Sequence, residues 1–212
     1  MKKIIIIFIL LSSVSAFSGS AKNQVEFTFE KGSSWYHEIK AGFIKIKGTP
    51  QVALWTETTD GKFIETVYVS KKAYKWYKKG TEDRLDVLPV WQSRENSDVD
   101  AVSGATISEE SSLHREISSA DGKIIMFAEI NNSFDYNDFY TEKGDGGTVK
   151  TGVNGQPSLI YSVEIDFGVK KQYKMNLTGH GSIGRKSGVI GTDMNRISTA
   201  KNIVRSIYVT VK

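Results

Sequence analysis

The chain has 212 residues, and its 28 Lys and Arg against 24 Asp and Glu give a formal net charge of +4. This near balance carries no bias toward nucleic acid, and the length suits one substantial hydrophobic core or two small ones. The sequence contains no cysteine, which excludes disulfides, thiolate metal sites and a lipid-anchored cysteine.

The first 21 residues have the pattern of a secretory signal peptide. A basic start, Met1 to Lys3, precedes an apolar run from Ile4 to Leu11, and cleavage would follow Ala16 or Ala21. The run is far shorter than the ~20 residues that a membrane-crossing helix needs, and no later run approaches that length. We predict an exported protein, periplasmic or secreted, that neither spans the membrane nor is a lipoprotein, with residues 22–212 as one domain.

Strand patterns dominate the rest of the chain. Asp60-Gly61 favours a tight hairpin turn, and Val169 to Lys171 would turn the chain between two later strands. Adjacent hairpins without βαβ alternation predict an all-β, mostly antiparallel β-sandwich. The runs with strand character are residues 25–29, 44–46, 52–56, 62–69, 122–130, 158–167, 173–177 and 207–211.

Two short helices are predicted between these strands. The first covers residues 107–116, and the second covers 199–206, with Ser198 as its cap and Ile203 facing the core. Residues 138–154 are the one soft boundary, because they include an exposed, flexible loop at 142–147.

The most informative stretch is Asp100-Ala101-Val102-Ser103-Gly104-Ala105-Thr106. It matches D-x-x-[ST]-G-A-T, the pattern at which a flavin transferase esterifies FMN onto the threonine hydroxyl. Gly104 lacks a Cβ and Ala105 is small, so a flavin ring or a transferase can approach the backbone. Thr106 would present its hydroxyl at a helix start that favours a phosphate, and Asp100 would help the transferase recognise the site.

The same residues fit an interpretation without a cofactor. Thr106-Ile107-Ser108-Glu109 is a T-x-x-E capping box, in which the threonine hydroxyl accepts from the Glu109 N–H and the Glu109 carboxylate accepts from the Thr106 N–H. Glu109 and Glu110 would also repel a phosphate placed close by. Thr106 is therefore either a flavin attachment point or a helix cap.

Local residues around the motif resemble a flavoprotein domain. Trp91-Gln92-Ser93 followed by Val99 to Ser108 is similar to the end of the FMN-binding domain of bacterial extracytoplasmic electron-transfer subunits, where Q-S leads into D-A-V-S-G-A-T. Residues 58–67 are similar to the strand-turn-strand opening of that domain. The chain departs from the pattern downstream, where no Ala-rich apolar helix follows.

The chain as a whole resembles a family of uncharacterised predicted periplasmic proteins with an immunoglobulin-like β-sandwich. The resemblance implies a non-catalytic protein accessory to extracytoplasmic flavin-linked redox or iron-uptake systems, with a flavin transferase and a membrane redox or uptake protein as partners. The alternative is an electron carrier with FMN covalently attached to Thr106. The resemblance rests on residues 52–57, 61–64, 99–106, 127–137, 152–159 and 177–181.

Other patterns favour structure over chemistry. The lysine and aromatic cluster at residues 71–79 could grip a nucleic acid, polysaccharide or anionic surface, but a solvated turn is favoured. Gly179 to Gly184 fits G-x-G-x-x-G, yet no apolar helix follows, so a mobile connection is favoured over a cationic loop with Arg185 and Lys186.

No metal or hydrolase site is predicted. Asp135, Asn137 and Asp138 could suit calcium, but the simpler interpretation has the acids facing water while neighbouring aromatics are buried. The three histidines are scattered, and no serine lies in a G-x-S-x-G elbow. Neither a base–nucleophile pair nor a metal cluster is visible, which argues against an independent enzyme.

Overall fold

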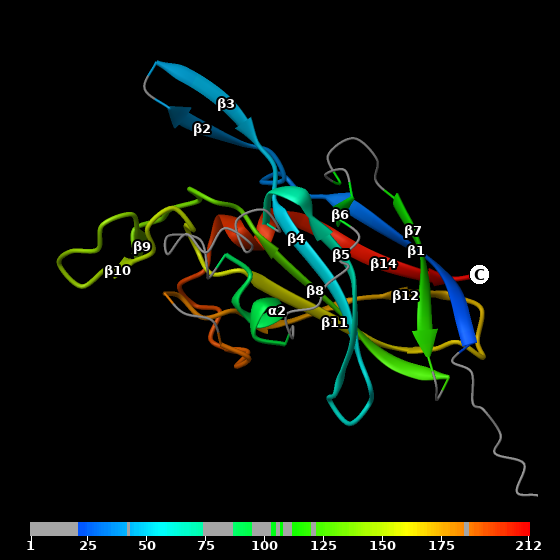
Figure 1. Ribbon diagram of the computed structural model, residues 1–212. Helices are drawn as coiled ribbons and strands as arrows, with labels where there is room; N and C mark the ends of the chain where they lie inside the picture. The colour runs from blue at the N-terminus through cyan, green and yellow to red at the C-terminus, as the bar shows by residue number, and fades with distance from the viewer. Residues whose placement is uncertain are drawn as a thin grey trace, which may run out of the picture.

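Two β-sheets packed face to face form the body of the protein (Figure 1). The computed structural model describes residues 21–41, 43–73, 87–94, 103–104, 107, 112–119, 122–184 and 187–212. In these residues almost all strand pairs are antiparallel, which confirms the predicted all-β, mostly antiparallel sandwich. The predicted signal peptide, apart from Ala21, lies outside the described residues.

The first sheet, called the β1 sheet, has the order β12-β14-β1-β7. Every neighbouring pair in it is antiparallel. Its strands are β1 (Ala21–Lys31), β7 (Ser112–Ser119), β12 (Gln172–Lys174) and β14 (Val204–Val211).

The second sheet, called the β4 sheet, has the order β13-β11-β8-β4-β5-β6. Its last pair, β5 with β6, is parallel, and the other pairs are antiparallel. Its strands are β4 (Gln51–Glu57), β5 (Phe63–Ser70), β6 (Ser103–Gly104), β8 (Lys123–Asn131), β11 (Leu159–Asp166) and β13 (Asn176–His180).

Smaller elements lie outside the two sheets. A hairpin of β2 (His37–Ala41) and β3 (Ile44–Gly48) projects from one end of the sandwich (Figure 1). The remaining elements are β9 (Tyr140–Thr141), β10 (Val149–Lys150), α2 (Pro89–Arg94) and the 3-10 helix η2 (Thr199–Asn202). None of the helices in the described residues is long and apolar enough to cross a membrane.

The main core lies between the sheets. Val25, Phe27 and Phe29 of β1 belong to the same buried cluster as Val52 and Leu54 of β4. Each of these side chains is almost fully buried, and burial of an aliphatic or aromatic side chain stabilises a fold by about 1.5–3 kcal/mol. The alternation that predicted the first strand therefore places its apolar face in this core.

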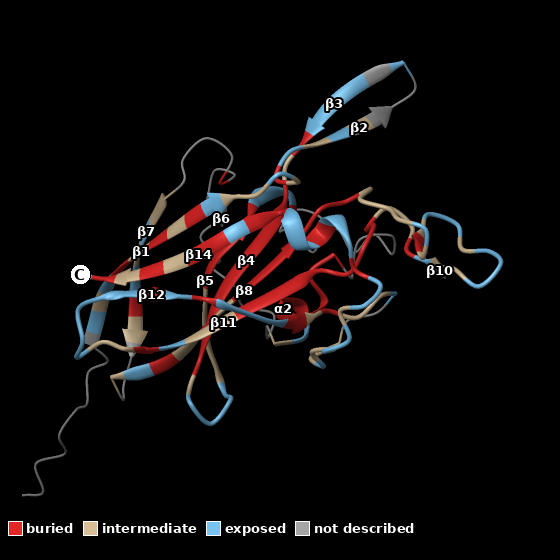
Figure 2. Cartoon of the chain, turned by 180° about the vertical axis from the view of Figure 1, so that it is seen from behind, coloured by how far each residue is buried: buried red, intermediate tan, exposed pale blue. Residues whose placement is uncertain are grey.

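A second core covers the opposite face of the β4 sheet. Ala53 and Trp55 of β4 pack there with Val90 and Trp91 of α2 and with Ile160 of β11. The Trp55 ring stacks on Phe127, with centroids 5.1 Å apart and planes 8° apart. Figure 2 shows the consequence: the central strands of this sheet are buried along most of their length.

The predicted hairpin at Asp60-Gly61 is confirmed. Strands β4 and β5 pair antiparallel on either side of it. The Thr58 N–H donates to the Lys62 carbonyl at 2.8 Å, and the Gly61 N–H donates to the Thr58 carbonyl at 2.9 Å. Gly61 has a φ of +84°, which glycine adopts without the Cβ clash of other residues.

The predicted helix at residues 107–116 is wrong from Ser112 onward. Those residues belong to β7, which pairs with β1 so that Leu113 lies opposite Phe27 and Arg115 opposite Val25. The pairing satisfies the backbone N–H and C=O groups of β7 that face β1, and Ile117 is buried in the main core. The start of the predicted helix, apart from Ile107, lies outside the described residues.

The second predicted helix is shorter than expected. The helical turn ends at Asn202, and the chain then enters β14 at Val204. Ser198 precedes η2 but makes no side-chain capping hydrogen bond. Ile203 is buried in the core, as predicted.

The segment after β11 does not form one simple hairpin. Tyr173 pairs with Val209 in the β1 sheet, whereas Leu177 pairs with Tyr161 in the β4 sheet. Met175 lies between them, and its N–H donates to the Ile207 carbonyl at 2.9 Å. This short stretch therefore crosses from one sheet to the other and closes one side of the core.

Candidate functional site

Two residues of the motif at 100–106 are described, and both lie in the β4 sheet. Ser103 and Gly104 form β6, which pairs in parallel with Val69 and Ser70 at the end of β5. Asp100, Ala105 and Thr106 lie outside the described residues, as do Ser108 and Glu109 of the predicted capping box. The two described motif residues thus contribute main-chain pairing to the fold.

The residue after the motif is also part of the fold. Ile107 is 5% exposed and belongs to the main core between the sheets. The chain is therefore tied to the sandwich on both sides of Ala105-Thr106, by backbone pairing before it and by an apolar side chain after it.

Helix α2 lies upstream of the motif, on the outer face of the β4 sheet (Figure 1). It contains the Trp91-Gln92-Ser93 stretch of the flavoprotein resemblance. Trp91 is fully buried, and its indole N–H donates to the Thr66 hydroxyl of β5 at 3.0 Å. Because β6 also pairs with β5, both α2 and the described motif residues contact the same strand, β5.

A buried glutamate receives the start of α2. Glu129 of β8 is 0% exposed, and its carboxylate accepts from the N–H groups of Val90 at 3.3 Å and Trp91 at 2.7 Å. The Ser158 hydroxyl donates to the same carboxylate at 2.6 Å. Glu129 thus satisfies N–H groups that a helix start leaves without intrahelical partners.

Burial controls the ionisation of this carboxyl group. Desolvation raises the pKa of Glu129 to about 7, against the smaller lowering effects of the hydrogen bonds from Ser158, Trp91 and Val90. The carboxyl group therefore titrates near neutral pH. With α2 bound to it, the arrangement is that of a helix anchor.

A second buried acid holds the end of α2. Glu57 accepts from the Arg94 guanidinium Nε at 2.9 Å and from the Trp55 indole N–H at 2.9 Å. The Glu57 side chain is 4% exposed and that of Arg94 is 33% exposed. Both ends of the helix are therefore fixed by carboxylates from the outer face of the β4 sheet.

The G-x-G-x-x-G stretch packs on this helix. A Cβ at Gly181 would lie 2.4 Å from the Ser158 hydroxyl oxygen and 2.7 Å from Cγ of Pro89, so only glycine fits there. His180 and Gly191 exchange two backbone hydrogen bonds of 2.9 Å. Within the described residues no helix follows this stretch before η2, and Arg185 and Lys186 lie outside them.

Among the described residues, the remaining candidates from the sequence do not gather into a metal site. Asn137 accepts from the N–H groups of Phe139 and Tyr140 through its Oδ1, so it shapes the loop, and Asp138 is exposed. Asp135 accepts from the Thr199 hydroxyl at 2.5 Å. No group of three or more metal-ligating side chains occurs in the described part of the chain. Most of the basic cluster, residues 74–79, lies outside it.

Neither Glu129 nor Glu57 was predicted from the sequence. The available signal was an acid inside an apolar strand, as in Phe127-Ala128-Glu129-Ile130. A charged residue is almost never fully buried unless it is paired, so this position called for a partner. The partners come from α2, 38 and 39 residues away in the sequence.

Comparisons of the chain with protein-family models, with curated proteins and with solved structures found no match.

Proposed function

We propose that the protein is an exported, non-catalytic β-sandwich that serves as an accessory to an extracytoplasmic flavin-linked redox or iron-uptake system. The basic start and apolar run of residues 1–21 support export, to the periplasm or outside the cell. The resemblance of the chain to periplasmic sandwich proteins supports the accessory role. A flavin transferase and a membrane redox or uptake protein are the proposed partners.

One observation supports this proposal: the described residues in and next to the motif take part in the sandwich. Ser103 and Gly104 pair with β5, and Ile107 is buried in the core. Packing and pairing account for these residues without a bound flavin. A protein that keeps the motif for its fold needs no cofactor of its own and can act through its surface.

The second candidate function is an electron carrier with FMN esterified to Thr106. It is favoured by the complete D-x-x-[ST]-G-A-T string. It is also favoured by the position of β6, which is the last strand in the order of the β4 sheet, so the motif enters at a sheet edge and not at its centre. Asp100, Ser103, Gly104 and Ala105 would then form the recognition sequence of the transferase.

Intact mass distinguishes the two candidates. The protein is exported from a host that contains an active flavin transferase, together with a control protein known to accept FMN. We expect an unmodified mass and no visible absorbance for this protein while the control becomes yellow. An added FMN mass that disappears in Thr106→Ala would establish the carrier instead.

Complementation tests the accessory role itself. Deleting the gene should lower flavin-dependent reductase or uptake activity in the source cells, and the wild-type gene should restore it. The accessory proposal predicts that Thr106→Ala also restores the activity, whereas a carrier would lose it. Full activity in the deletion strain would contradict both roles.

A further inference from the structure

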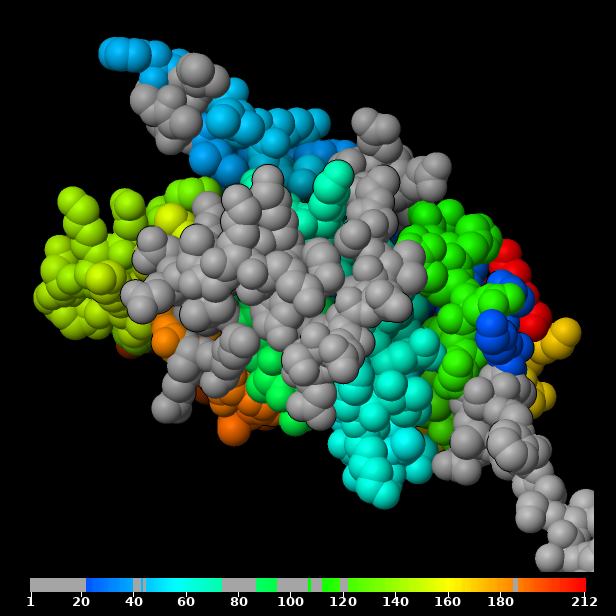
Figure 3. All heavy atoms as spheres, in the orientation of Figure 1, coloured from blue at the N-terminus to red at the C-terminus, as the bar shows by residue number. Residues whose placement is uncertain are grey.

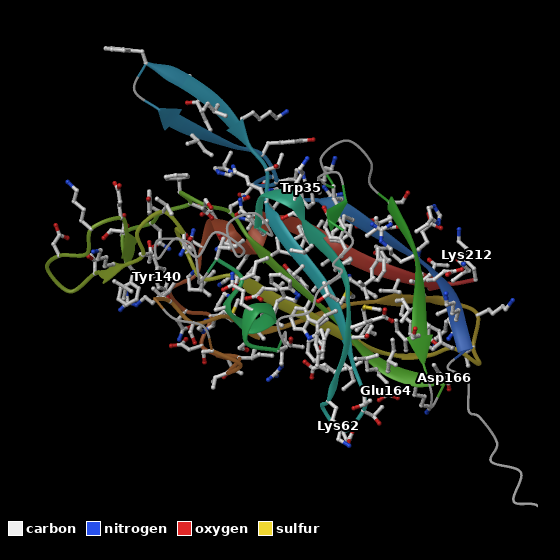
Figure 4. All side chains as sticks on the ribbon, in the orientation of Figure 1. Trp35, Lys62, Tyr140, Glu164, Asp166 and Lys212 are labelled. Carbon is white, nitrogen blue, oxygen red and sulfur yellow. The ribbon has the colours of Figure 1, made fainter. Side chains whose placement is uncertain are left out.

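The β2–β3 hairpin stands apart from both sheets. It extends beyond the outline of the sandwich (Figure 3), and in the described part of the chain its two strands pair only with each other. Figure 4 shows Trp35 where the hairpin leaves the body, and Trp35 is buried in the main core. The hairpin is thus anchored at its base, and each of its strands has one edge with which no described strand pairs.

Such a hairpin is incomplete as a sheet. Two strands alone are marginally stable in water, and a stable sheet needs three or more. The backbone N–H and C=O groups along an open edge are also a template for pairing with a further strand. Phe43 at the turn is fully exposed and Ile46 of β3 is 50% exposed, so water also reaches apolar side chains of the hairpin.

The residues of β2 make its edge complementary to itself. Ile39 is the middle residue of this five-residue strand, and Glu38 and Lys40 lie on either side of it. Antiparallel pairing with β2 of a second copy, centred on Ile39, places Glu38 of each copy opposite Lys40 of the other. The same register uses every residue of the strand. Opposite charges in such cross-strand pairs stabilise a sheet.

The edge of β3 has the opposite character. Its middle residue is Ile46, which lies between Lys45 and Lys47. Antiparallel pairing of β3 with a second β3 would therefore set Lys45 opposite Lys47 twice, and like charges opposite each other destabilise a sheet. Lysines on an edge strand commonly protect that edge against pairing. Charge thus selects the edge of β2 over the edge of β3.

Pairing at β2 also improves the charge arrangement of each hairpin. Lys40 lies opposite Lys45 within the hairpin, so one cross-strand pair joins two positive residues. A second β2 places an acid, Glu38 of the other copy, on the open side of that pair. Glu38 already contacts the Lys45 ammonium of its own hairpin at 3.1 Å, but its side chain is 50% exposed. Since a carboxylate accepts several hydrogen bonds, Glu38 can contact a lysine of the second copy as well.

We propose that the protein forms a homodimer in which the β2 strands of two copies pair antiparallel about Ile39. The product is a four-stranded ribbon of order β3-β2-β2-β3 with a two-fold axis at its centre, so both copies contribute the same surface. The register also brings the turn of one hairpin, with Phe43, beside the base of the other, where Tyr36 is 39% exposed. Neither the accessory role nor FMN on Thr106 is required for this dimer.

Sedimentation equilibrium of the exported protein over a range of concentrations tests the dimer. The paired surface is small, so we expect a mass that rises from one chain toward two chains only at high protein concentration. Glu38→Lys and Lys40→Glu each replace the two attractive pairs of the interface by two repulsive ones. Each variant should therefore raise the dissociation constant by about tenfold or more.

Exchanging the two charges provides the specific test. The double variant Glu38→Lys with Lys40→Glu again has opposite charges across both contacts of the dimer. Inside the hairpin it keeps one pair of like charges and one pair of opposite charges, as in the wild type. The double variant should therefore recover the wild-type dissociation constant. An equal mixture of the two single variants should also dimerise, because the charges are opposite in a mixed pair.

Glu164→Lys is the matched control. The Glu164 side chain is 60% exposed, close to the 50% of Glu38, and each of these acids contacts one lysine or more in its own chain. Glu164 lies at the end of the sandwich away from the hairpin (Figure 4). This variant should keep the wild-type dissociation constant.

Three results would overturn the proposal. The first is a wild-type mass of one chain at every concentration. The second is a dimer that Glu38→Lys leaves unchanged, which would assign the contact to another surface. The third is loss of the dimer in both single variants without recovery in the double variant, which would mean that positions 38 and 40 do not face each other across the interface.

Discussion

The β1 sheet and the β4 sheet share one core but differ on their far faces. In β1 the side chains of Glu26, Thr28 and Glu30 alternate with the buried ones and reach water to different degrees. In β4 every residue is buried, because α2 and neighbouring segments cover the outer face. A sheet that is covered twice gains apolar burial, but any charge on its outer face must find a partner there.

The comparison explains where the unusual residues lie. Glu57 and Glu129 are both on the covered face, and both accept hydrogen bonds from α2. On the β1 sheet the acids stay exposed in part and form surface pairs, such as Glu26 with Lys212 at 2.8 Å. Substitutions in the outer layer reveal whether the stability of the doubly covered sheet depends on that layer.

The largest effect is expected at the stacked tryptophan of the outer core. Trp55→Ala removes a fully buried ring and its stack on Phe127, and should lower the free energy of unfolding by about 3–5 kcal/mol. Urea denaturation measures the change. Tyr208→Ala, at a half-buried side chain of β14, is the matched control, and its free energy of unfolding should fall much less. Equal losses in the two variants would mean that a side chain of the outer core stabilises the fold no more than a half-buried surface side chain does.

The next effect is a pH dependence. The pKa of Glu129 is raised from 4.5 to about 7 in the folded protein, so the folded state binds a proton that the unfolded state releases between these values. Stability should therefore be highest below pH 4.5, as far as this group is concerned, and fall by about 3 kcal/mol as the pH rises to above 7.

Unfolding of wild type and Glu129→Gln at pH 5 and pH 8 measures the contribution of Glu129 to the pH dependence of stability. The variant cannot ionise there, so it should lose most of the difference between the two pH values. Glu164→Gln, at an exposed acid on β11, should keep the wild-type difference. A slope that persists in Glu129→Gln would assign the titration to another group.

A smaller effect is expected where the glycine stretch covers the helix. Gly181→Ala places a Cβ 2.7 Å from Pro89 Cγ and 3.0 Å from the Glu129 carboxylate, and should destabilise the protein by about 1–3 kcal/mol. Thermal unfolding monitors the loss. Gly168→Ala is the control, since its nearest neighbour is a single exposed Asp166 oxygen at 3.0 Å. An unchanged Tm in Gly181→Ala would show that the segment around Gly181 shifts at little cost to make room for the added Cβ.

The smallest effect compares two ion pairs. Arg94→Ala leaves the buried Glu57 carboxylate without its cation, and we expect a loss of about 1–2 kcal/mol because Arg94 is partly exposed. Lys62→Ala breaks the exposed pair with Asp60 and should lose less than about 1 kcal/mol. Chemical denaturation of both variants gives the difference. A larger loss of stability in Lys62→Ala than in Arg94→Ala would mean that Arg94 does not offset the cost of burying the Glu57 carboxylate.

The sequence predicted the strands best where one face meets water. Val25, Phe27 and Phe29 alternate with polar residues, and the structure places them in the core as expected. On β11 the same alternation places Leu159 and Tyr161 on the core face, yet Ile160 between them is buried too, in the outer core. Alternation of apolar and polar residues indicates that one face of a strand is buried. It does not indicate whether a second layer covers the other face.

The wrong part of the helix prediction, residues 112–116, has a simple physical origin. Leu113 and Ile117 are four residues apart, and this spacing places two side chains on the same face of a helix and also on the same face of a strand. The capping signal at Thr106 and Glu109 favoured the helix. Pairing with β1, which decides the outcome, depends on residues about ninety positions away, such as Ala21 opposite Ser119.

The candidate site was predictable only in part. The motif at residues 100–106 was evident in the sequence, but its parallel pairing with Val69 and Ser70 was not. The anchoring of α2 on Glu129 was equally hidden, because a helix of this length carries no strong pattern of its own. Both depend on contacts between segments that are distant in the sequence.

The complete enclosure of Glu129 also governs how fast it responds to pH. A carboxyl group with no exposed surface exchanges its proton only when water reaches it, which requires α2 or the segment around Gly181 to lift. The same opening frees the amide hydrogens of Val90 and Trp91. The hydrogen-exchange rate of these two amides therefore reports the rate at which Glu129 can gain or lose its proton. After a pH jump that is faster than this opening, Glu129 keeps its earlier protonation state until the opening occurs.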